Sequence, residues 1–192
     1  MRAATITSSS AGFAVDSLLV AGTRGGRITL NGRVPVDTGL SLFLRVDAVP
    51  LADFGELVQA RPALEGTTTL RAELHGSRAR PDLYFNGTLR GALIAGARLD
   101  QVIADGKYLN RRLTTSLEYA RKGVPAIHAQ ATVPIDLAFR PAGPRLLEEP
   151  MTGRVRTDSV GLDLFEMFST SVSGAKGSLA LVDTPGLLLR LV

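Results

Sequence analysis

The chain has 192 residues, a formal net charge of +4 and a hydrophobic content of 45%. It contains no cysteine and no tryptophan and only two histidines, which excludes disulfides and cysteine nucleophiles and argues against a zinc site. Arginines and lysines are scattered singly or in pairs along the chain. We therefore predict no nucleic-acid partner, because such proteins usually gather basic residues on one surface.

Alternation of apolar and polar residues with a period of two is the dominant pattern, and it first appears in residues 40–47. Its apolar positions there are Leu40, Leu42, Leu44 and Val46. Residues 50–58 then change to a helical spacing, with Pro50 and Asp53 suited to the first turn. This region predicts a strand followed by one or two helical turns.

The alternation returns in residues 69–75, where Leu70, Ala72 and Leu74 share one side. Further alternating runs cover residues 83–90, 113–119, 127–133 and 135–139. Residues 160–168 change again to helical spacing. Pairs such as Asn31-Gly32, Asp105-Gly106 and Lys122-Gly123 indicate turns or bulges between or inside the strands. The predicted fold class is all-β, antiparallel, with one or two short helices.

Three landmarks recur in order along the chain. Residues 34–37 (Val-Pro-Val-Asp) are matched by residues 133–136 (Val-Pro-Ile-Asp), and two later phrases follow the same order. We interpret residues 1–192 as one segment of a repetitive β-domain, with approximate repeats over 13–112 and 113–192, the second incomplete. Repeat architectures need polar caps, and neither end supplies one, so we expect a segment of a longer protein.

No catalytic set emerges from the sequence. His75 and His128 each stand alone in an alternating pattern, which is typical of exposed strand residues. Glu148 and Glu149 are adjacent and lie near prolines, an arrangement typical of solvated loops. The glycine-rich residues 22–26 lack the lysine of a phosphate-binding loop and predict a turn. We therefore predict a protein that is not an enzyme and that uses no metal or cofactor.

The apolar face of the predicted strands is the candidate site. Its predicted lipid-groove residues are Leu40, Leu42, Leu44, Val46, Leu70, Leu74, Leu83, Phe85, Ile127, Ile135 and Leu137. The residues alone allow two interpretations. The face is either the core of an ordinary β-sandwich, which composition favours, or a groove for acyl chains.

The order of several phrases resembles the TamB family of the AsmA-like superfamily. The resemblance rests on Gly26–Pro35, on the strand at residues 40–46 and on the Pro-Leu-Ala-Asp-Phe segment Pro50–Phe54. It continues through Leu74-His75-Gly76-Ser77 with Arg80-Pro81, and through Leu99–Tyr108. It spans most of residues 13–192, although Val182–Pro185 lacks the expected Gly-Ser/Thr pair.

The resemblance implies an elongated, curved sheet with an aliphatic groove that conducts phospholipids between the inner and outer membranes and supports outer-membrane assembly. It further implies a periplasmic location in an inner-membrane-anchored parent of a Gram-negative bacterium. The implied partners are phospholipid acyl chains and, through the full-length parent, an outer-membrane barrel protein. The alternative is a structural sandwich or solenoid module that binds a protein partner by edge-strand addition. A carbohydrate-active protein is disfavoured by the absence of tryptophan and of a spaced acid pair.

Overall fold

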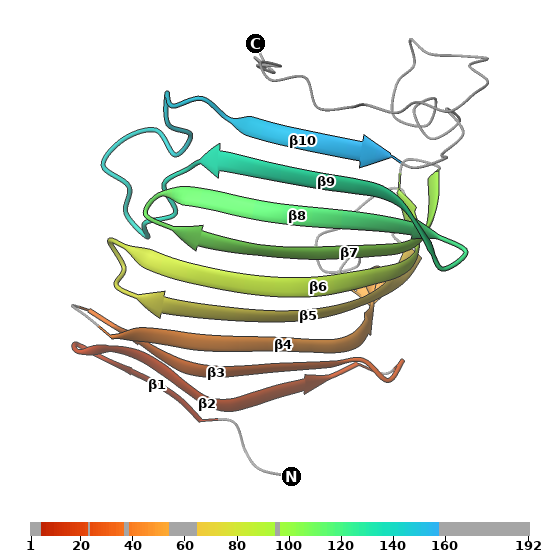
Figure 1. The fold of residues 1–192 in the computed structure, drawn as a ribbon. Helices are drawn as coiled ribbons and strands as arrows, with labels where there is room; N and C mark the ends of the chain where they lie inside the picture. Colours follow the sequence, from red (N-terminus) through yellow and green to blue (C-terminus); the bar gives the residue numbers. More distant parts are fainter. Residues whose placement is uncertain (1–4, 23, 37–38, 54–64, 95–96, 158–192) are drawn as a thin grey trace.

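The computed structural model describes residues 5–22, 24–36, 39–53, 65–94 and 97–157. In this part of the chain ten strands form one curved antiparallel sheet in strictly sequential order (Figure 1). The strands are β1 (Thr5–Ser9), β2 (Gly12–Ala21), β3 (Arg27–Pro35), β4 (Leu40–Pro50), β5 (Glu65–Gly76), β6 (Pro81–Ile94), β7 (Ala97–Leu109), β8 (Arg112–Arg121), β9 (Val124–Pro134) and β10 (Thr152–Thr157). The predicted all-β, antiparallel class is confirmed.

The register places residues of the same kind opposite one another. Leu42 of β4 lies opposite Leu74 of β5, which lies opposite Leu83 of β6. Residues directly opposite in an antiparallel pair point to the same face, so the apolar positions of successive strands join. The strands predicted at residues 40–47, 69–75, 83–90, 113–119 and 127–133 lie within β4, β5, β6, β8 and β9.

Left-handed backbone conformations form the tight turns. Asn110 and Arg111 have φ angles of 50° and 60° between β7 and β8, and Lys122 and Gly123 have 52° and 79° between β8 and β9. Two successive positive φ angles match the right-handed twist of the flanking strands. The turn predicted at Lys122-Gly123 is confirmed. Gly32 instead lies inside β3, where an added Cβ would sit 1.9 Å from a backbone oxygen.

The strand predicted over residues 135–139 is wrong. Strand β9 ends at Pro134, and beyond it only Ile135 forms an isolated bridge, to Leu146. The Asp136 carboxylate accepts a hydrogen bond from the Ala138 N–H at 2.8 Å, which turns the chain away from the sheet. The alternating pattern continues through residue 139, but the hydrogen bond between the Asp136 side chain and the backbone two residues later favours a turn over a strand.

Residues 51–53 are helical, as predicted, but the rest of the first expected helix lies outside the described residues. The second helix, predicted at residues 160–168, also lies outside them, as does most of the second repeat after β10. The predicted boundary between residues 112 and 113 falls at the start of β8, where the sheet continues without a break. No helix in the described part of the chain is long and apolar enough to cross a membrane.

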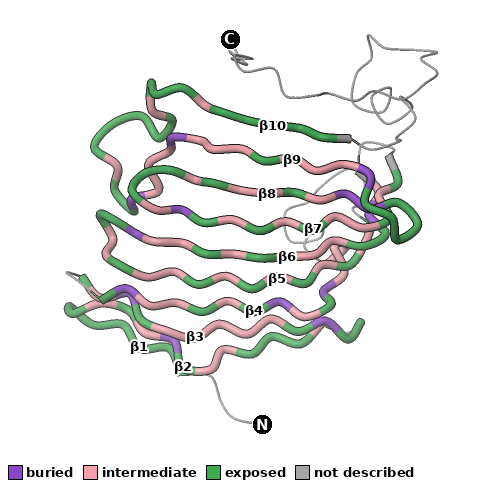
Figure 2. The backbone as a smooth tube through the Cα atoms, viewed as in Figure 1, coloured by how far each residue is buried: buried purple, intermediate pink, exposed green. Residues whose placement is uncertain are grey.

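Buried side chains gather toward the ends of the strands. Figure 2 shows buried positions mainly near both strand ends and half-buried positions along the middle. Each strand contacts chiefly its neighbours in the sheet, and no second sheet packs on either face within the described ranges. The sheet is therefore a single layer, and its core consists of small clusters at the strand ends, such as Tyr119 with Ala126.

Candidate functional site

The register brings all the predicted groove residues except Ile135 and Leu137 onto one face. We call it the apolar face; the opposite side is the polar face. Other residues that share the apolar face are Ile28, Leu30, Ala72, Leu89, Val102, Tyr108, Leu113, Leu117, Tyr119, Ala129 and Val133. The apolar face runs from β3 to β9, across the direction of the strands, and Thr115 of β8 is a polar residue within it.

Side chains in the middle of the apolar face remain partly open. Leu40 and Val46, toward opposite ends of β4, are only 3% and 4% exposed. Leu42, Leu74 and the other groove residues of the strands are half-buried, and Leu117 is 39% exposed. No described element lies over them, as a second sheet would in a sandwich. Within the described residues the face is an accessible aliphatic surface.

On the apolar face, glycines lie opposite two large side chains of neighbouring strands. A Cβ on Gly106 would lie 2.5 Å from the Phe85 ring, and a Cβ on Gly87 would lie 3.2 Å from the Leu70 side chain. In each pair the large side chain therefore lies over the glycine of the neighbouring strand. This pairing gives an aromatic or aliphatic group room to lie along the sheet.

Ile135 and Leu137 lie in a segment that crosses one end of the apolar face. We call residues 135–139 the strap. The Ile135 N–H donates to the Arg111 carbonyl at 2.9 Å, and the Leu137 N–H donates to the Tyr108 hydroxyl at 2.9 Å. Figure 1 shows the β9–β10 connection running down past the ends of β8 and β7. The strap thus borders the apolar face where Tyr108 is 2% exposed.

Asp136 and Arg145 hold the strap in place. The Asp136 carboxylate lies 3.5 Å from the Arg111 guanidinium. The Arg145 guanidinium donates to the carbonyls of Asp136 and Ala138 at 3.1 and 3.2 Å. The sequence contains no periodic signal for such an arrangement, because its contacts lie in irregular segments, within the β9–β10 connection and from it to the β7–β8 turn.

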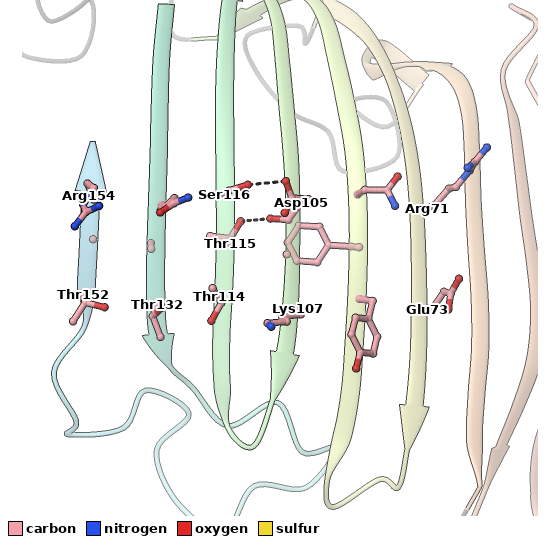
Figure 3. Close-up of a pocket in the computed structure, with 17 residues that line it drawn as sticks. Arg71, Glu73, Asp105, Lys107, Thr114, Thr115, Ser116, Thr132, Thr152 and Arg154 are labelled. Atoms are coloured by element: carbon pink, nitrogen blue, oxygen red, sulfur yellow. Dashed lines mark hydrogen bonds between the residues drawn. The ribbon is translucent and has the colours of Figure 1, made fainter. Parts of the chain in front are cut away.

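The polar face carries a furrow of about 910 Å³ across β5 to β10 (Figure 3). Its side chains come from two polar rows, and the backbone between the rows forms its floor. The rows are Arg71, Asn86, Asp105, Ser116, Gln130 and Arg154, and Glu73, Tyr84, Lys107, Thr114, Thr132 and Thr152. The Ser116 hydroxyl donates to the Asp105 carboxylate at 2.6 Å. Sequence reasoning missed the furrow because its two rows are drawn from six strands that only the register brings side by side.

The two histidines lie on the polar face beside single carboxylates. His75 Nε2 is 3.4 Å from a Glu73 oxygen, and His128 Nδ1 is 3.4 Å from a Glu118 oxygen. Glu149 pairs with Arg112 near the β7–β8 turn. The described residues hold no group of three or more His, Asp or Glu side chains that could bind a metal ion. The prediction of strand positions for both histidines is confirmed.

Two electrostatic features separate the faces. On the polar face, a hydrogen bond from Arg45 at 2.8 Å lowers the pKa of the exposed Asp47 carboxyl. On the apolar face, burial raises the pKa of the Tyr119 hydroxyl, and the Asp100 carboxylate adds to that effect. Burial thus disfavours the ionised form of Tyr119, and the ion pair favours the ionised form of Asp47.

Over the described residues, the fold and site define a single-layer antiparallel sheet with one mainly aliphatic and one polar face. Comparison of the chain with protein-family models, with curated proteins and with solved structures finds no match.

Proposed function

We propose that the apolar face binds the acyl chains of phospholipids. In this proposal the chain is a segment of an inner-membrane-anchored, periplasmic protein that carries phospholipids between the inner and outer membranes and supports outer-membrane assembly. The observation that carries the proposal is the mainly aliphatic surface from β3 to β9, half-buried along its middle and uncovered there by any described element. The resemblance to the TamB family supports the transport role and the outer-membrane barrel partner.

Physical chemistry favours such a ligand. An acyl chain in water exposes apolar surface at about 0.8 kcal/mol for each CH₂ group. An aliphatic surface that crosses many strands lowers that cost along its length, because it covers one side of the chain, and it needs no specific headgroup contact to do so. Side chains such as Leu42 and Leu74, which are already half-buried, gain burial when a chain lies against them.

Two adjacent residues of β4 provide the test. Leu42 points to the apolar face, whereas Phe43 is 45% exposed and points to the polar face. We expect a photoreactive side chain at position 42 or 74 to form adducts with phospholipid in the full chain, detected by mass spectrometry. The same group at position 43 or 45 should form none. Adducts mainly at 43 and 45 would contradict the proposal.

Aspartate substitutions separate an open face from a closed core. We expect Leu42→Asp to abolish phospholipid binding while circular dichroism still shows a folded sheet, because water reaches a half-buried position. Phe43→Asp is the matched control and should leave lipid binding unchanged. Complete unfolding of Leu42→Asp, with no lipid bound by the unsubstituted chain, would instead indicate a closed core, where an unpaired carboxylate is strongly destabilising.

The sheet edges favour edge-strand addition by a protein partner as a second candidate. All residues of β1 are exposed, as are residues 152–156 of β10, and each of these strands pairs on one side only within the described chain. An unpaired edge presents backbone donors and acceptors to another strand. A partner that adds a strand should slow amide exchange in β1 or β10, whereas a lipid on the apolar face should protect the middle strands.

A further inference from the structure

Arg78 lies next to the strap, at the same end of the apolar face, and its side chain reaches from the β5–β6 turn to β3. Its backbone carbonyl, in the β5–β6 turn, accepts a hydrogen bond from the Phe139 N–H at 2.9 Å. Its guanidinium reaches past the start of β4 and donates from Nη2 to the Val34 carbonyl at 3.0 Å. Leu40, the first residue of β4, is only 3% exposed beside this path. A cationic group therefore borders the aliphatic surface.

One donor of that guanidinium is unused. The Nε atom of Arg78 is buried and has no hydrogen-bond partner in the described part of the chain. A buried donor without an acceptor is uncommon in a native protein, and a bound water or ion is a usual explanation. The fork of a guanidinium matches the oxygens of carboxylates and phosphates, which accept two parallel hydrogen bonds.

Two more arginines belong to the segments that meet at the Arg78 carbonyl. Arg80 closes the β5–β6 turn, where its N–H donates to the Ser77 hydroxyl at 3.0 Å. Arg140 follows Phe139, whose N–H bonds to the Arg78 carbonyl. We call Arg78, Arg80 and Arg140 the arginine corner.

Acidic groups do not neutralise this corner. No ion pair joins any of the three arginines to an acid of the described ranges. Asp82 is close in sequence, but its register opposite His75 directs it to the polar face. Asp136 lies in the strap and is engaged by Arg111. The unpaired Nε of Arg78 and the charges of the other two arginines in the corner favour an anion with several oxygen acceptors.

We propose that the arginine corner is a phosphate-binding site. The phosphate of a phospholipid headgroup suits it best, because the acyl chains of the same molecule can lie on the adjoining apolar face. This assignment of the source rests on the proposed function, whereas the affinity for phosphate does not. A free phosphate ion is the other source of the same chemistry, and the experiment must distinguish the two.

The test compares three soluble probes on the isotopically labelled full chain by calorimetry and NMR. They are dihexanoyl phosphatidylglycerol, dihexanoylglycerol, which has the same acyl chains without phosphate, and inorganic phosphate. Arg80→Gln with Arg140→Gln removes two exposed charges, and Arg78→Lys keeps the charge but loses the fork. Each variant should weaken phosphatidylglycerol binding by about tenfold, the size expected for a charged hydrogen bond. Arg90→Gln, on the polar face, is the matched control and should have no effect.

The outcomes separate this site from the proposed function. Lipid binding that is equal for both dihexanoyl probes and indifferent to the arginine variants would overturn the site and leave the acyl-binding face intact. Phosphate binding that depends on the corner, without any lipid binding, would support the site and refute the proposed function. Binding of none of the probes would overturn both. Unchanged amide shifts for Leu137 and Phe139 in Arg78→Lys would show that the strap is still in place.

Discussion

The apolar and polar faces are built from the same strands, and one position along a strand separates them. Leu42, Leu74 and Leu83 form a row on the apolar face, while the adjacent positions Phe43, Glu73 and Tyr84 form a row on the polar face. The first row is half-buried and the second is exposed. Because no described layer covers either row, the difference comes from side-chain packing within one sheet.

The comparison shows which face stabilises the sheet. The polar face carries exposed ion pairs such as Arg45 with Asp47, and pairs of this kind add little to stability because water and salt screen them. The apolar face carries the packing of large side chains over glycines and the buried residues at the strand ends. Stability and the proposed ligand therefore depend on the same face, so the two must be perturbed separately.

Gly106→Ala should have the largest effect on stability. Its Cβ would meet the Phe85 ring at 2.5 Å and the Thr114 carbonyl oxygen at 2.9 Å. We expect the free energy of unfolding to fall by about 2 kcal/mol, a typical cost of overpacking. Urea denaturation followed by circular dichroism measures it.

Gly153 of β10 is the matched control, because it occupies the same row of the apolar face. A Cβ there would have its nearest neighbour at 3.5 Å, an ordinary contact. Gly153→Ala should leave the free energy of unfolding unchanged or raise it by about 0.5 kcal/mol, because alanine lowers the conformational entropy of the unfolded chain. Equal losses in both variants would show that Phe85 does not lie over Gly106.

Tyr108→Phe tests the strap with a smaller effect. The change removes the hydroxyl that accepts the Leu137 N–H at 2.9 Å, and it leaves a part-buried donor unpaired. We expect a loss of about 1 kcal/mol in unfolding free energy and faster amide exchange at Leu137. Tyr84→Phe, on the polar face where the side chain is 43% exposed, should change neither quantity. A strap that exchanges equally fast in the unsubstituted protein would contradict the interpretation.

Alkaline pH should produce the smallest effect. Burial raises the pKa of the Tyr119 hydroxyl above its ordinary value of 10.0. Below that value Tyr119 is neutral in both the folded and the unfolded chain. As the pH rises through the raised pKa the unfolded chain ionises first, so the free energy of unfolding declines.

Tyr119→Phe should remove this part of the decline, because phenylalanine cannot ionise. Chemical denaturation at a series of alkaline pH values compares the variant with the unsubstituted chain. An identical slope for both proteins would mean that Tyr119 ionises equally in the folded and unfolded states.

The strands whose residues alternate could be predicted, because one face of each is less exposed than the other. Strands β1, β2, β3, β7 and β10 were not predicted from alternation. Every residue of β1 is exposed, the register of β2 shifts between Val15 and Leu18, and β10 has only six residues. Ile135 and Leu137 followed the alternation but left the sheet after Pro134. The local pattern predicts which side chains of a strand share a face. It does not predict the residue at which the strand ends.

The candidate site, like the fold, could be predicted from the sequence only in part. The predicted groove residues of β4, β5, β6 and β9 were chosen from alternation and resemblance, and the register places them on one face. The strap and the arginine corner were not predicted, because the β5–β6 turn, the end of β7 and the strap meet only when the sheet forms. Pairwise contacts across such distances leave no period in the sequence.

Sequential strand order has a kinetic consequence. Each strand pairs with the one before it in the chain, so most contacts span a single hairpin and the contact order of the sheet is low for a β protein. The sheet can therefore grow hairpin by hairpin as the chain leaves the ribosome, without waiting for a distant partner strand. By the same logic, evolution can lengthen or shorten it by whole hairpins, since each insertion alters only the two strands that receive it.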